Sequence, residues 1–262
     1  MAWTKTKTMA SAGLVVLVLG AAFAVWRMYH PPVNDRIFRM EYIGLQRSPG
    51  NVLILRPTHF AGSPRRGDVT YAADPQAAKP VMRMMGYKVS FAQVIASAYS
   101  CSPDRIVLPP DAPKGEYDFL VTVPGQPNEH LQAAIKTKLG WVADWEPRPT
   151  EVLVLKIKTP DAPALHLSAN GENTSLSFRN GKLQATHLRL VYLSGLLERA
   201  LKHPILDQTG RTNYYDFSLE WDPNQYPDVP DLASVNEILG QLGLELQPDT
   251  ASMPMMMVKR AR

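Results

Sequence analysis

The sequence predicts an α+β protein made of two tandem α/β modules, each with the order helix-strand-helix-strand-strand, after an N-terminal transmembrane helix. Three observations lead to this prediction: an uncharged apolar stretch near the N-terminus, alternating helix-like and strand-like apolar patterns after it, and one order of elements that recurs in both halves. The 262 residues, 45% of them hydrophobic, suffice for one or two cores.

Residues 9–26 carry no charged side chain and, as a helix, would be about 27 Å long at ~1.5 Å per residue, enough to cross a hydrocarbon core. Lys5 and Lys7 precede the stretch and Arg27 follows it. We therefore expect a single-pass signal anchor in the cell membrane, with the body on the periplasmic or extracellular side. The alternative is a signal peptide cleaved near Ala24, which would give a secreted protein.

Composition divides the chain into five ranges. The predicted ranges are 1–28 for the transmembrane signal anchor, 29–50 for a proline-containing juxtamembrane linker, 51–158 for the first module, 159–181 for a polar linker and 182–262 for the second module.

The first module is predicted from its apolar patterns. Ser90 and Gln93 form a capping box at the start of an amphipathic helix that reaches Tyr99, and Gly140 ends a second helix. The remaining elements are a first strand at 51–57, a long loop at 58–80, a half-buried strand at 117–123, and a hairpin of strands 141–145 and 151–157 around Glu146-Pro147-Arg148-Pro149.

The second module repeats that order. A helix spans 190–201, and Asp231 caps another helix that ends at Gly243. The predicted strands are 204–206, 215–221, 244–247 and 255–259. Residues 91–119 align without a gap with residues 189–217, which places Tyr117-Asp118-Phe119 opposite Tyr215-Asp216-Phe217.

Three motifs of the second half carry a family resemblance: Asp207-Gln-Thr209-Gly210, Tyr215-Asp216-Phe217, and residues 239–246 (LGQLGLEL). Together they resemble an uncharacterised, soil-associated bacterial family. Arg211 and Asn213 depart from its pattern, which has an apolar residue and commonly a glycine at these places. The resemblance implies a secreted or N-terminally anchored envelope protein, in some members fused to an antirepressor-type sensor metallopeptidase. It implies no catalytic residue, because the family has no established activity.

Charge and motifs exclude several function classes. The net charge is +4, but the 28 basic and 24 acidic residues are mixed along the chain, so we predict no nucleic-acid binding. The six histidines show no metal-ligand spacing, and phosphate-loop and hydrolase motifs are missing from the sequence. We therefore predict no cofactor and no metal site.

Asp118, Asp207 and Asp216 are the carboxylates that could support a hydrolase. Asp207 invites comparison with the Asp-Thr-Gly loop of aspartic proteases, but an extra residue separates it from Thr209-Gly210. We favour structural roles for all three, in turns and at strand starts. Whether the protein is an enzyme stays open, and we regard a non-catalytic function as the better interpretation.

The predicted contact site is the basic loop that carries His59, Arg65 and Arg66. We expect a membrane-anchored envelope protein that works as a non-catalytic binding or regulatory module, with a possible envelope protein as partner. The alternatives are an accessory domain of a sensor peptidase or envelope transport complex, and a hydrolase that uses the three aspartates. The sequence leaves the oligomeric state open.

Overall fold

The computed structural model describes residues 33–73, 82–160, 162, 164–169, 173–179, 182–220 and 231–262. In this part of the chain, twelve strands form three four-stranded sheets, and six α-helices accompany them. The chain divides into two compact units: the described residues up to Ala98 with Pro113–Leu139, and Tyr99–Ala112 with Gly140–Arg262. Each predicted domain is one continuous range, whereas each of these units is made of two separate segments of the chain.

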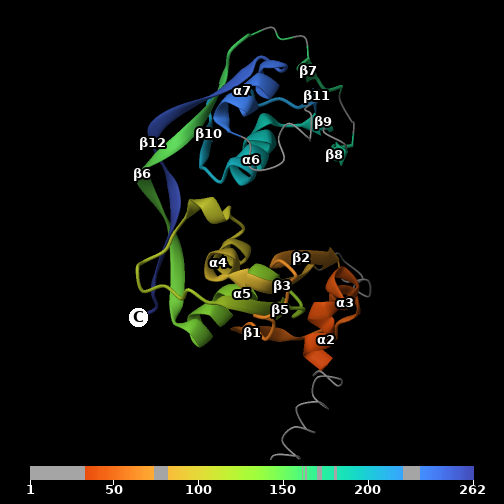
Figure 1. Cartoon of the computed structure of the whole chain (residues 1–262), viewed down its shortest axis with the longest axis vertical. Helices are drawn as coiled ribbons and strands as arrows, with labels where there is room; N and C mark the ends of the chain where they lie inside the picture. Colours follow the sequence, from red (N-terminus) through yellow and green to blue (C-terminus); the bar gives the residue numbers. More distant parts are fainter. Residues whose placement is uncertain are drawn as a thin grey trace, which may run out of the picture. The chain divides into compact units, whose positions relative to one another are not determined.

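The first unit is built on an antiparallel sheet of order β1-β5-β3-β2 (Figure 1). The strands are β1 (Leu53–Pro57), β2 (Asp68–Ala73), β3 (Met82–Ser90) and β5 (Glu116–Val121). The helices are α2 (Val33–Arg39), α3 (Glu41–Arg47), α4 (Phe91–Tyr99) and α5 (Pro127–Ala134). The predicted capping box opens α4: Ser90 N–H donates to Gln93 Oε1 (2.9 Å) and Gln93 N–H to Ser90 Oγ (3.2 Å).

Helices α2 and α3 cover one face of this sheet. Phe38 of α2 and Leu45 of α3 are fully buried in an apolar cluster with Met85, Tyr87 and Leu120 from the sheet. Arg83 of β3 donates to the carbonyl of Ser48 (2.7 Å) just after α3, so the helix end has a buried partner. Residues 29–50, which we expected to be a linker, thus contain two helices that complete a core.

The second unit holds two sheets. One has the order β10-β6-β12-β4, and the other the antiparallel order β7-β11-β9-β8. Their strands are β4 (Ile106–Val107), β6 (Trp141–Ile157), β7 (His166–Leu167), β8 (Ser175–Arg179), β9 (Lys182–Leu188), β10 (Ile205–Asp207), β11 (Tyr215–Glu220) and β12 (Leu244–Arg260). Helices α6 (Leu190–Leu201) and α7 (Leu232–Gly240) share one apolar core with both sheets.

Strands β6 and β12 are each continuous over 17 residues and pair with each other along their whole length. The predicted hairpin at 141–157 and the two short strands predicted at 244–259 are therefore wrong. The predicted hairpin turn contains Pro147 and Pro149, and the two short predicted strands leave out Pro248 and Pro254.

The ladder tolerates these prolines because all four share one phase, that is, they occupy positions whose backbone nitrogen points away from the partner strand. The N–H of Leu153, opposite Pro248, donates to the carbonyl of Pro204 just before β10 (2.9 Å) and so points away from β12. Pro149 and Pro147 have the phase of Leu153, and Pro254 lies opposite Pro147. Because hydrogen-bonded and non-hydrogen-bonded pairs alternate in an antiparallel ladder, no proline interrupts the β6–β12 bonds.

The predicted fold class is wrong in its arrangement, although α+β describes the structure. The order β1-β2-β3-α4-β4-β5-α5-β6 recurs as β7-β8-β9-α6-β10-β11-α7-β12, so the repeated unit begins with three strands rather than a helix. The two final strands pair with each other in one sheet, and hence the repeats are not separate modules. Residues 159–181, expected to be a linker, contain β7 and β8.

The membrane part of that prediction finds no support in the described residues, where no helix is both long and apolar enough to span a bilayer. The stretch 9–26, predicted to be a transmembrane helix, lies outside the described residues.

The phase rule predicts opposite outcomes for proline at two neighbouring positions of β12. Ser252 faces Pro149 and shares the phase of the native prolines, whereas Ala251 lies in the hydrogen-bonding phase. We expect Ala251→Pro to lower the free energy of unfolding by roughly 2–3 kcal/mol more than Ser252→Pro, because a ladder bond is lost and its acceptor is left unpaired. Urea denaturation measures both, and equal costs would contradict the assigned phase.

Candidate functional site

The repeated Tyr-Asp-Phe motif caps a bulge in the neighbouring strand. In the first unit Asp118 is fully buried and accepts hydrogen bonds from Thr58 Oγ1 (2.8 Å), His59 N–H (3.0 Å) and Lys88 N–H (3.1 Å). Lys88 is left-handed (φ 52°) and lies where the β3–β5 register shifts. The carboxylate thus satisfies the amide that the bulge takes out of the ladder.

Asp216 does the same in the second unit. It accepts hydrogen bonds from Ser168 Oγ and from the N–H of His187 (2.7 Å), which is again left-handed (φ 53°) at a register shift. The Ser168 hydroxyl, followed by the His187 amide, holds the pKa of Asp216 below its usual value. The motif recurs because the same backbone irregularity recurs.

Asp207 has a third, local role. Its Oδ1 accepts from the N–H (2.9 Å) and the hydroxyl (2.7 Å) of Thr209, two residues on, ahead of Gly210 at φ 66°. Each of the three aspartates is thus engaged by donors of its own unit. The aromatic residues of both motifs are buried as predicted core positions: Tyr117, Phe119, Tyr215 and Phe217.

Arg65 and His59 of the basic loop make contacts within their own unit. Arg65 pairs with Glu41 (3.2 Å), donates to the carbonyl of Phe38 (3.2 Å) and stacks on Tyr87. His59 has a half-exposed ring 3.4 Å from Asp35 Oδ1, and Arg66 is exposed. A contact role for His59, Arg65 and Arg66 stays a prediction, and Arg65 has a structural role besides.

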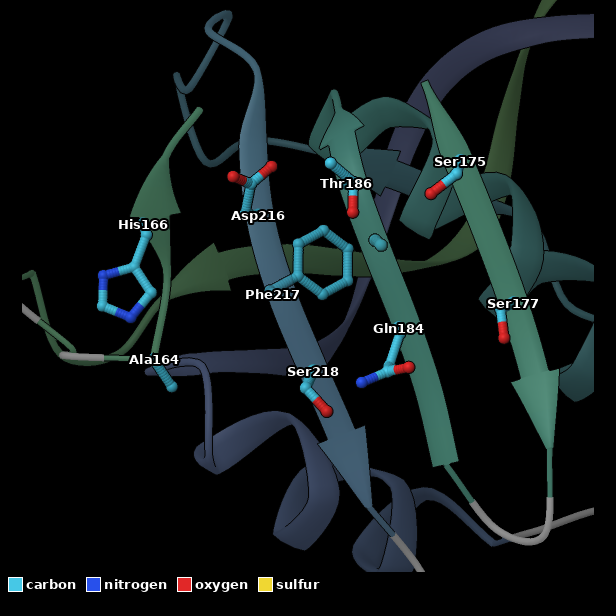
Figure 2. Close-up of a pocket in the computed structure, with 10 residues that line it drawn as sticks. Ala164, His166, Ser175, Ser177, Gln184, Thr186, Asp216, Phe217 and Ser218 are labelled. Atoms are coloured by element: carbon cyan, nitrogen blue, oxygen red, sulfur yellow. The ribbon is translucent and has the colours of Figure 1, made fainter. Parts of the chain in front are cut away.

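A polar groove lies on the outer face of sheet β7-β11-β9-β8 (Figure 2). It has a volume of about 500 Å³. Its polar lining comes from all four strands, which is visible in Figure 2: His166 of β7, Asp216 and Ser218 of β11, Gln184 and Thr186 of β9, and Ser175 and Ser177 of β8. The helices α6 and α7 pack in the apolar core against the other face.

The same face is apolar in the first unit. Strand pairing shows which residues of the two sheets are equivalent. Leu120 and Ser218 each follow the Phe of a Tyr-Asp-Phe motif, and they pair with Met85 and Gln184 respectively. By the same registers Tyr87 corresponds to Thr186. In the first unit these residues are buried under α2 and α3; in the second they are hydroxyl and amide side chains that line a groove.

Among the described residues that line the groove, Asp216 is the one carboxylate, and it is already engaged by two donors. At the end of the sheet Lys182 Nζ binds Glu220 (2.5 Å). The Oγ of Ser218 is buried and has no hydrogen-bond partner among the described residues. The arrangement can therefore exchange hydrogen bonds with a neutral polar ligand.

Sequence reasoning missed this groove. The polar phase of residues 215–220 was visible as Asp216, Ser218 and Glu220, but β8 and β9 were not predicted as strands. The alternation of Leu183, Gln184, Ala185 and Thr186 was the available signal.

Replacement of Asp216 by Asn tests the capping role. We expect the free energy of unfolding to fall by about 1 kcal/mol at pH 7, because charge-assisted bonds to Ser168 and His187 are weakened in a partly solvated place. The carboxylate pKa is lower folded than unfolded, so its contribution exists above the unfolded pKa of about 3.9 and is lost as pH falls through the folded pKa.

The deficit should therefore begin to shrink as pH falls below about 4 and disappear below the folded pKa. Asp111→Asn, which removes an exposed carboxylate bound to Arg260, is the control and should change stability little. A deficit that stays constant as pH is lowered from 7 through the acid range in denaturant titrations would rule out the charge of Asp216 as its cause.

Comparison with known proteins found no match among curated proteins and none among solved structures. A family model described as "Protein of unknown function (DUF3738)" matches residues 92–261, which confirms the predicted membership of an uncharacterised family. The matched range includes all four strands that line the groove. The chain therefore belongs to the DUF3738 family.

Proposed function

We propose that the protein is a non-catalytic binding module whose polar groove takes an uncharged, hydroxyl-rich ligand such as a neutral glycan. The observation that carries this proposal is that one face of the sheet changes from apolar to polar between the two repeats. In the first unit that face is apolar and covered by α2 and α3; in the second it presents Gln184, Thr186 and Ser218 to a groove. A face that had only to be covered would have kept its apolar residues.

The chemistry of the lining selects the ligand class. Serine and threonine hydroxyls and the Gln184 amide both donate and accept hydrogen bonds, as the hydroxyls of a sugar do. The anionic Asp216 disfavours phosphates and acidic chains. Hydrogen bonds from Ser168 and His187 already stabilise its charge, so a cation would add little. A neutral polyol can satisfy the unpartnered Ser218 Oγ without bringing charge into the groove.

We also propose that the protein acts on the periplasmic or extracellular side of the membrane. The uncharged residues 9–26 support export, and the resemblance to soil-associated, secreted or anchored proteins implies the same place. A role as an accessory domain of a sensor peptidase or transport complex rests on the resemblance alone.

The groove is tested by removal of one amide and one hydroxyl. In calorimetric titration with cellohexaose, xylohexaose and chitohexaose, we expect at least one to bind. Gln184→Ala with Ser218→Ala should weaken that binding about tenfold or more, because two hydrogen bonds are lost.

Gln247→Ala with Ser252→Ala removes the same two groups from the exposed part of β12 and should leave the affinity unchanged. Polygalacturonate, an anionic polymer, should not bind. Equal affinity of wild type and the groove variant would overturn the site, and preference for polygalacturonate would overturn the ligand class.

A further inference from the structure

A second, smaller cavity lies at the edge strand of the same sheet, on the side of the core. Its volume is about 300 Å³, at the lower end of the range of roughly 300–1,000 Å³ for small-molecule sites. Its lining combines polar groups with the apolar side chains of Ile157, Leu165, Leu167 and Leu242, and the polar groups make up the larger share. The polar groups that line it are Thr159, His166, Arg211 and Tyr215.

Tyr215 brings an unsatisfied donor to this cavity. Its side chain is 2% exposed and belongs to the apolar core, yet its hydroxyl has no hydrogen-bond partner among the described residues. A buried hydroxyl without a partner costs about 1–3 kcal/mol. An acceptor on a bound molecule would remove that cost.

The Asp207-Gln-Thr209-Gly210 turn places Arg211 at the same cavity. Thr209 Oγ1, itself held by Asp207, accepts from the N–H of Arg211 (3.2 Å), and Gly210 supplies the left-handed step before it. The guanidinium donates one bond, from Nη2 to the carbonyl of Pro160 (3.1 Å). In the described part of the chain the guanidinium has no carboxylate partner, and no carboxylate lines the cavity.

We infer that this cavity binds a small carboxylate with an apolar tail, such as a short-chain fatty acid. Arg211 and the Tyr215 hydroxyl supply charge-assisted donors to the carboxylate, and the hydroxyl of Thr159 is a third. The apolar side chains of Ile157, Leu165 and Leu242 contact the hydrocarbon tail and take it partly out of water. A positively charged ligand would meet Arg211 without a counter-ion. Tyr215 faces this cavity and Asp216 the polar groove, because neighbouring strand residues point to opposite faces, and His166 borders both.

The test uses hexanoate in a carboxylate-free buffer, with calorimetry or amide NMR shifts as the readout. We expect saturable binding of hexanoate, with hexanol at least tenfold weaker and hexylamine not bound. Arg211→Gln should weaken hexanoate at least tenfold, and Tyr215→Phe several-fold. Arg199→Gln removes an exposed arginine of α6 and is the matched control, with no expected change.

Two further readouts keep the inference separable from folding and from the proposed groove. Tyr215→Phe should leave thermal stability unchanged or raise it, because it deletes an unpaired hydroxyl. The Gln184→Ala, Ser218→Ala variant should bind hexanoate like wild type. Equal affinity for hexanol and hexanoate, or full affinity in Arg211→Gln, would overturn the carboxylate site and leave the groove untouched.

Discussion

The rest of the second sheet depends on the hydrogen bond from the His187 amide to Asp216. A bulge adds one residue to β9, and this changes which side chains point inward: Ala185 and Leu188, three positions apart, both reach the core. Without a partner for the amide at the bulge, the extra residue would be costly and the strand could slip by one position. A one-residue slip would turn Gln184 and Thr186 toward the core and destroy the groove.

Repetition of this device lets the two copies carry different side chains on one face of the sheet. Asp118 and Lys88 hold the first sheet in the register that Asp216 and His187 give the second. On that fixed frame, side chains of one face can change without a change of backbone. The first unit uses the face to bind α2 and α3, and the second leaves it polar. A structural scaffold and a candidate binding surface thus come from one repeated unit.

The β6–β12 ladder explains why the repeats do not form independent modules. Trp141 and Leu244 begin strands of equal length, 103 positions apart, and the register places Pro149 opposite Ser252, again 103 positions apart. The repeat that relates β6 to β12 therefore also maps the ladder onto itself, and the Pro149–Ser252 pair is the centre of this symmetry. Strand β10 joins β6 and β4 joins β12 in parallel, which extends the same symmetry across the sheet.

The sequence by itself determined the elements with strong local signals: the capping box of α4, the Asp231 cap of α7, the left-handed Gly140 and Gly243, and the equivalence of the two Tyr-Asp-Phe strands. It could not show the short helices α2 and α3 or the edge strands β2, β7 and β8, because seven or fewer residues give too little periodicity. Only the tertiary structure decided that prolines pass through a continuous ladder, since their tolerance depends on which way an N–H points. For the same reason only pairing across strands could gather Ser175, Gln184 and Ser218 into one groove: residues distant in the chain become a site when register places them on one face.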